Sequence, residues 1–148
     1  MVMKKVVYDS RVAKVLLCLS NCHTIMLGGF VFSTLKEEEM AQATRNHECV
    51  HARQWIEMTV LCGILVLVPV LAFGVSAWWM LLSGLVFYVW YVLEWAYKGL
   101  VYWALGDEWG CEKSSAYANV SFEREARFAA YNSNYLENAG YFGWLKEL

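Results

Sequence analysis

Residues 47–51 read His-Glu-Cys-Val-His, a pattern whose residue types and spacing suit a metal ion and an activated water. On a helix, positions i and i+4 lie on one face about one turn apart, so His47 and His51 can converge on one zinc ion. Glu48 then lies beside the metal, where its carboxylate can take a proton from zinc-bound water and pass it to a leaving group. Zinc lowers the pKa of its water to about 7, so this segment predicts hydrolytic chemistry at neutral pH.

A catalytic zinc site needs a third protein ligand and an open position for water. The chain has only 3 His, and the one outside the pattern is His23. A better source is Glu123 or Glu125, which follow an expected helix start and lie on different helical faces, so only one of them is expected to bind. The alternatives are a helix with two surface histidines and acids that only favour a helix N-terminus.

The segments His47–Gln54 and Glu123–Ala126 together resemble the gluzincin metallopeptidases. They look closest to the membrane-embedded members, which include proteases of prenylated CAAX proteins and of damaged membrane proteins. In those families the third ligand begins an ExxAD-type motif on a later helix, so matching Ala126 to its Ala makes Glu123 the ligand. The family's Asp falls at Arg127, a departure that leaves open which group orients a ligating His. The resemblance also implies that residues 24–33 are a candidate substrate edge.

Composition places this chain of 148 residues at the size of one domain, with 59% hydrophobic residues against about 45–50% in ordinary soluble domains. Aromatic residues make up 16%, and Trp and Tyr favour membrane–water interfaces. The net charge of −2 excludes nucleic acid as an expected partner. Five cysteines without a CxxC pattern predict reduced thiols, and the short apolar stretch at residues 15–19 predicts no cleaved signal peptide.

The dominant feature is an uncharged run over residues 58–93, which is too long for one membrane crossing and slightly short for two. Pro69 and Gly74 near its middle predict a helical hairpin in which the first helix runs to about Val68 and the turn follows. With flanking residues, the two transmembrane helices are expected at about 55–73 and 77–104. The alternative is a buried core hairpin of a soluble protein.

Charge distribution predicts the orientation of this hairpin. All 12 Lys and Arg lie outside the uncharged run, and the expected turn carries no charge. The positive-inside tendency therefore predicts an integral protein of the inner or plasma membrane, with both termini and the metal site in the cytoplasm.

Outside the hairpin, β-branched and aromatic runs predict two or three short strands within residues 6–10, 12–19 and 24–34. A helix is expected to follow, capped by Ser33 or Thr34, with acids in its first turn, and to continue into the first crossing. Residues 106–120 predict a polar loop, and Ser121 is expected to cap a last helix.

The fold class predicted is mainly α: a transmembrane helical hairpin plus zincin-like metal-site helices and a small N-terminal β element, in a single domain over residues 1–148. The function predicted is zinc-dependent hydrolysis of a peptide bond at or near the membrane, with Zn²⁺ on His47, His51 and Glu123 and with Glu48 as general base. The expected partners are the lipid bilayer and a peptide or membrane-protein substrate. Alternatives are a lipid amide or ester hydrolase with the same site, a non-catalytic zinc-binding sensor or assembly protein, and a protein that binds no metal.

Overall fold

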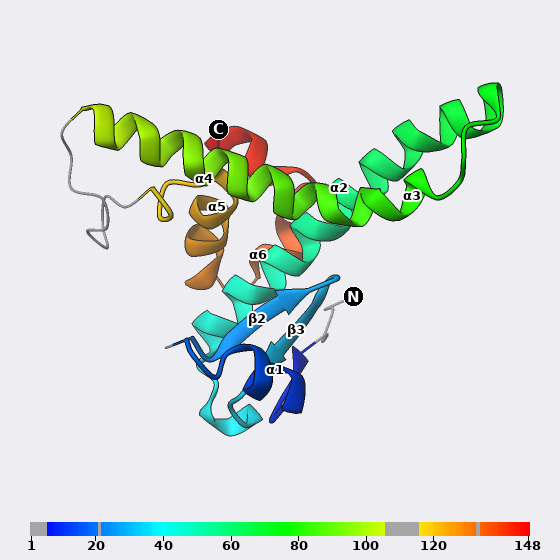
Figure 1. Cartoon of the computed structure of the whole chain (residues 1–148). Coiled ribbons are helices and arrows are strands. Elements are labelled where there is room, and N and C mark those ends of the chain that lie inside the picture. Colours follow the sequence, from blue (N-terminus) through cyan, green and yellow to red (C-terminus); the bar gives the residue numbers. More distant parts are fainter. Residues whose placement is uncertain (1–5, 21, 106–115, 133) are drawn as a thin grey trace. The chain divides into compact units, whose positions relative to one another are not determined.

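The chain is described by a computed structural model over residues 6–20, 22–105, 116–132 and 134–148. It is mainly helical, with one small sheet and two long apolar helices (Figure 1). Two compact units are distinguished, and each is described by itself. Unit 1 comprises residues 1–53 and 125–141, and unit 2 comprises residues 54–124 and 142–148.

Unit 1 contains the predicted N-terminal β element as a three-stranded sheet in the order β1-β3-β2. Strand β1 (Val6–Val7) runs parallel to β3 (Phe30–Ser33), whereas β2 (Thr24–Leu27) runs antiparallel to it. Gly28 and Gly29 join β2 to β3 with φ angles of +57° and +77°. Positive φ at both central residues is what a two-residue hairpin turn requires, so the Gly-Gly pair closes a β-hairpin.

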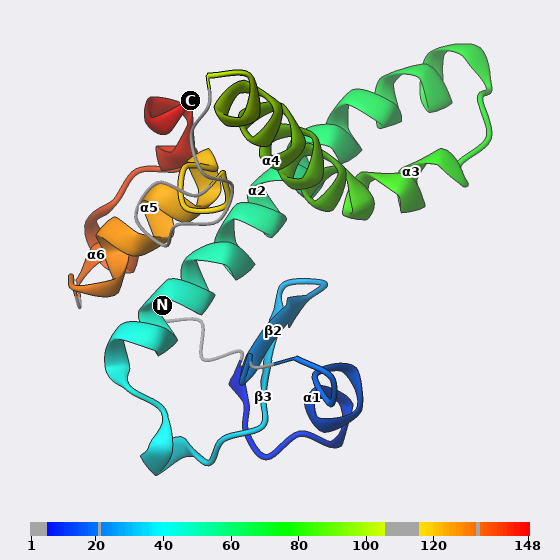
Figure 2. The same ribbon diagram turned by 60° about the vertical axis from the view of Figure 1, so that its left-hand side comes forward.

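The expected strand at residues 12–19 is wrong, because residues 11–16 form the helix α1 (Arg11–Leu16), which lies beside the sheet (Figure 2). The Ser10 hydroxyl accepts a hydrogen bond from the Ala13 backbone N–H at 3.5 Å, as an N-cap does. Ala13 is fully buried. A short apolar run has no periodicity that separates helix from strand, and here the serine cap was the deciding local signal.

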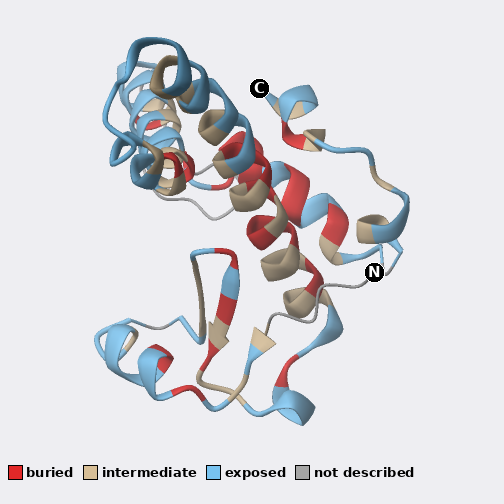
Figure 3. Ribbon diagram, turned by 90° about the vertical axis from the view of Figure 1, so that its right-hand side faces the viewer, coloured by how far each residue is buried: buried red, intermediate tan, exposed pale blue. Residues whose placement is uncertain are grey.

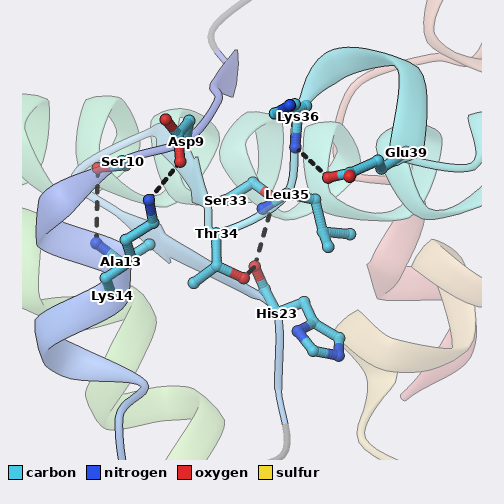
Figure 4. A network of polar contacts seen from close by, with 10 residues as sticks. All are labelled: Asp9, Ser10, Ala13, Lys14, His23, Ser33, Thr34, Leu35, Lys36 and Glu39. Carbon is cyan, nitrogen blue, oxygen red and sulfur yellow. Dashed lines mark hydrogen bonds and ion pairs between the residues drawn. The ribbon is translucent and has the colours of Figure 1, made fainter.

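Polar contacts fix the ends of the β element (Figure 4). The carbonyl oxygen of His23 accepts hydrogen bonds from the Ser33 and Thr34 hydroxyls, each at 3.3 Å. Lys14 forms an ion pair with Asp9 and thereby holds the pKa of that exposed carboxyl below its usual value. The contacts tie the start of β2 and the end of β3 together, next to the segment that leads into the motif helix.

The motif helix starts later than predicted. Ser33 belongs to β3, and the acids Glu37–Glu39 form a separate 3₁₀ turn, η1, in which the Lys36 N–H donates to Glu39 Oε2 at 2.8 Å. Helix α2 (Gln42–Phe73) begins after this turn. It then continues without a break from the His-Glu-Cys-Val-His segment into the apolar run, which confirms the predicted continuity.

The core of unit 1 lies where the first turns of α2 meet the last turns of α5 (Ser121–Ala130). Val50 of α2 and Ala126 and Ala129 of α5 are fully buried against one another. The side chains of Tyr135 and Leu136 from α6 (Tyr135–Asn138) cover this cluster. Small alanines let the two helices approach closely at the level of the motif.

Unit 2 contains the predicted hairpin, but its first helix does not end at Val68. Helix α2 passes through Pro69 and ends at Phe73, where Gly74 takes a φ of +66°. A left-handed glycine just past the last helical residue is a common helix terminator, so Gly74 rather than Pro69 makes the turn. The chain returns through α3 (Trp79–Leu82), the 3₁₀ turn η2 (Ser83–Leu85) and α4 (Val86–Ala104).

Close contacts hold the two arms of the hairpin together. The indole N–H of Trp55 donates to the Gly84 carbonyl oxygen at 2.8 Å, and a Cβ at Gly84 would lie 3.4 Å from the Trp55 ring. A Cβ at Gly63 would lie 3.8 Å from the Ser83 hydroxyl. Small residues at the crossing points are typical of helix pairs that pack in lipid.

Both hairpin helices are long and apolar enough to cross a membrane. In the most apolar 18 residues of each, only 11% of the α2 stretch and 17% of the stretch in Trp79–Ala104 are buried (Figure 3). Helices at the core of a soluble protein are mostly buried, so this exposure favours a lipid environment. Most of the predicted polar loop, residues 106–115, lies outside the described residues.

Candidate metal site

The two histidines of the motif converge on a common point. His47 and His51 lie one turn apart on α2, and their Nε2 atoms are 3.1 Å apart. The rings are nearly perpendicular, with centroids 4.7 Å apart. Two zinc ligands at 2.0–2.1 Å in a tetrahedral site are about 3.3 Å apart, so the pair fits one shared ion. The same spacing also permits a direct imidazole–imidazole hydrogen bond in the absence of metal.

Glu48 is held by the β element of the same unit. The Thr24 hydroxyl, on the first residue of β2, donates to Glu48 Oε1 at 2.6 Å. Glu48 is half-buried, and the helix places it directly after His47. The hydrogen bond limits the carboxylate to one orientation and leaves the second carboxylate oxygen as the one positioned to accept a proton.

The two candidate acids of α5 differ in their hydrogen-bond donors. In unit 2, the Tyr91 hydroxyl donates to Glu123 Oε1 at 2.8 Å. In unit 1, the Tyr135 hydroxyl donates to Glu125 Oε1 at 2.9 Å. Both acids are buried, at 2% and 4% exposure, so neither is the solvated helix N-terminus that acids often provide.

The two candidate acids also belong to different units. Glu125 lies in unit 1, as do His47 and His51, whereas Glu123 lies in unit 2. The choice of Glu123 as third ligand therefore remains a prediction from the sequence.

Polar groups of α4 anchor the first turn of α5, where Glu123 lies. The Glu94 carboxylate accepts hydrogen bonds from the Ser121 backbone N–H at 2.8 Å and from the Ser121 hydroxyl at 2.7 Å. Lys98, four residues after Glu94, pairs with the same carboxylate at 2.7 Å and donates to the Asn119 carbonyl oxygen. Ser121 is thus the first residue of the helix, and the Glu94 carboxylate satisfies its backbone N–H.

Helix α2 also contacts that turn through Gln54, a residue of unit 2. Gln54 is 1% exposed, and its Nε2 donates to the Phe122 carbonyl oxygen at 3.1 Å. Arg127, which stands where the resembled families have an Asp, is exposed.

His23, the histidine outside the motif, is exposed and contributes its backbone carbonyl oxygen to the β element (Figure 4).

Sequence reasoning missed Thr24 and Tyr91. Each donates to a carboxylate that lies 24 and 32 residues away along the chain, respectively. Neither residue belongs to a motif, and Tyr91 stands in a run of aromatic residues typical of a membrane interface. The only sequence signal was for Thr24, which has a hydroxyl and stands in the segment expected to lie beside the metal motif.

For the zinc hydrolase that the sequence predicts, Thr24→Val is expected to lower turnover about 10-fold or more without loss of metal, because groups that orient a catalytic side chain typically contribute that much. Valine keeps the shape of threonine and removes the donor to Glu48. The measurement compares turnover and bound zinc for this variant and for the matched Thr34→Val, whose hydroxyl contacts only the His23 carbonyl among the contacts described. Equal turnover of the two variants would contradict a role for Thr24 in holding Glu48.

Comparisons with protein families, with curated proteins and with solved structures found no match for this chain.

Proposed function

We propose that this chain is a membrane-embedded zinc metallohydrolase, and specifically a peptidase of the gluzincin type. The observation that carries the proposal is the 3.1 Å separation of the His47 and His51 Nε2 atoms on one turn of α2, with Glu48 between them in sequence. The third ligand in this proposal is Glu123, which the resemblance implies and which is buried at 2% exposure. His₂Glu with one open position is the ligand set of catalytic rather than structural zinc.

Each residue of the site has a definite role in this proposal. When bound, zinc polarises a carbonyl and makes hydroxide available near neutral pH. Glu48, oriented by Thr24, accepts the proton of the attacking water and passes it to the leaving nitrogen. His47, His51 and Glu123 hold the metal and leave its remaining position to water and substrate.

The place of the motif along α2 supports a substrate at the membrane surface. From Gln54 to Phe73 the helix has 20 residues, which is about 30 Å at 1.5 Å per residue and matches the hydrocarbon core of a bilayer. His51 lies three residues before Gln54, or about 5 Å along the axis. A metal held there acts on a bond close to the lipid headgroups, which favours a membrane-protein or membrane-bound peptide substrate.

Metal content of the purified chain tests the proposal directly. We expect one zinc ion per chain after gentle purification in detergent, or uptake of one ion on titration of the metal-free protein. No bound zinc and no uptake would overturn the metallohydrolase. Zinc binding together with hydrolysis of lipid amides or esters, and not of peptides, would keep the site and replace the substrate class.

Labelling with a membrane-impermeant maleimide tests the proposed orientation, in which both termini and the metal site face the cytoplasm. Cys18 and Cys22 are exposed thiols of unit 1, and Ser76 lies in the exposed hairpin turn. We expect the chain in intact cells to remain unlabelled and to react at Cys18 and Cys22 only after permeabilisation. The variant Ser76→Cys should react from outside. The reverse pattern would show that the hairpin is inserted the other way.

A further inference from the structure

Helix α4 carries polar groups that an anchoring helix does not need. Tyr91, Glu94 and Lys98 follow one another at spacings of three and four residues, which places them on one face of the helix. All three make hydrogen bonds to residues 119–123, at the start of α5. The rest of α4 is rich in exposed apolar and aromatic side chains, among them Val89, Val92, Leu93, Tyr97 and Leu100.

These contacts fall into two kinds. Glu94 and Lys98 bond the backbone and the first residue of α5, so they fix where the helix begins. Tyr91 instead bonds the side-chain carboxylate of Glu123, at 2.8 Å. The Tyr91 ring is itself held between neighbours, since it stacks on Phe122 with an interplanar angle of 19° and lies 6.1 Å from the Phe87 ring. Its hydroxyl therefore has little freedom to turn away.

Burial of Glu123 makes its hydrogen bond to Tyr91 important for the carboxylate. Glu123 is 2% exposed, and a buried carboxylate needs donors to replace its lost hydration. A hydroxyl fixed on Oε1 restricts rotation of the carboxylate. A ligand that is already oriented loses less conformational entropy on binding metal, and this raises the affinity for the metal.

We propose that Tyr91 is a positioning residue for Glu123, the third metal ligand of the proposed function. The inference rests on the proposed function, because it assigns Tyr91 a role toward the same His47, His51 and Glu123 set. Tyr91 acts through Glu123 and does not itself bind the ion.

The test is the zinc affinity of the full chain in detergent, measured by competition with a chelating dye, for Tyr91→Phe against the matched Tyr97→Phe. Tyr97 is on the same helix and 67% exposed, so its hydroxyl serves as the control. We expect Tyr91→Phe to weaken zinc binding by about 10- to 100-fold, the usual effect of removing a partner of a metal ligand. Tyr97→Phe should bind zinc as the unaltered chain does.

A double-mutant cycle separates positioning from general stability. In a Glu123→Ala background, Tyr91→Phe should cause no further loss of zinc affinity, because the group it positions is gone. The visible spectrum of bound Co²⁺ should also change in Tyr91→Phe and not in Tyr97→Phe, which a purely structural role would not produce. Unchanged affinity in Tyr91→Phe, with a loss in Glu123→Ala, would overturn this inference and leave the metallohydrolase standing. Absence of zinc binding in the unaltered chain would overturn both.

Discussion

Glu48→Gln is expected to abolish most hydrolysis while the chain keeps its zinc. Glutamine has the shape of glutamate and still reaches the Thr24 hydroxyl, but it cannot accept a proton from water. General acid–base groups contribute about 10²- to 10⁴-fold to rate, so turnover should fall by that range. Bound zinc should stay at one ion per chain, because Glu48 is not one of the three proposed ligands.

The measurement uses a quenched fluorescent peptide library anchored to phospholipid vesicles, with metal content determined on the same samples. Glu38→Gln is the matched control, since Glu38 is an exposed acid of η1. If Glu48→Gln cleaves as fast as the control while the unaltered chain binds zinc, the chain is a metal-binding module rather than a hydrolase. Loss of zinc in Glu48→Gln would instead show that this carboxylate is a ligand.

His51→Ala should lose zinc affinity by about 10²-fold or more. Zinc binding to a structural site is worth on the order of 10 kcal/mol, so one of three protein ligands accounts for about 3 kcal/mol. His51 is 7% exposed, and its Nε2 lies 3.1 Å from that of His47, so no solvent-exposed role explains its position. At micromolar free zinc the variant should therefore be largely metal-free and inactive.

His23→Ala controls for the loss of any imidazole, because the His23 residue is exposed and its backbone carbonyl makes the described contacts. Zinc affinity is measured for both variants in detergent, and helicity is followed by circular dichroism to confirm folding. Equal affinity of His51→Ala and the unaltered chain would remove the motif from the site. We expect His51→Ala to fold and to bind zinc more weakly. His23→Ala should bind zinc as the unaltered chain does.

The spacing of residue types along the chain was enough to predict the motif helix and the two long apolar helices. The His-Glu-Cys-Val-His spacing predicts that both imidazoles share a helical face, and α2 places them there. The uncharged run predicts two apolar helices, and the described helices Gln42–Phe73 and Trp79–Ala104 have the required length. The paired glycines at 28 and 29 marked the hairpin turn. Each of these depends on residues a few positions apart, which is the range that periodicity and turn chemistry describe.

The ends of the helices and strands were predicted less well, because contacts with neighbouring elements decide where each one begins and ends. The segment 12–19 has the apolar residues of a strand, yet the Ser10 cap and the buried Ala13 make it helical. Pro69 usually breaks a helix, but its cost is local, and α2 continues to Phe73. Ser33 pairs with Thr24 in the sheet and is therefore not available to cap the motif helix.

The sequence by itself determined which groups can do chemistry: two imidazoles on one helical turn, an acid beside them, and a choice between Glu123 and Glu125 for the third ligand. Only the tertiary structure decided what holds them, since Thr24 reaches Glu48 across 24 residues and Tyr91 reaches Glu123 across 32. The physical reason is that a hydrogen bond between distant residues depends on how separate elements pack, and the spacing of residue types along one element does not encode that packing.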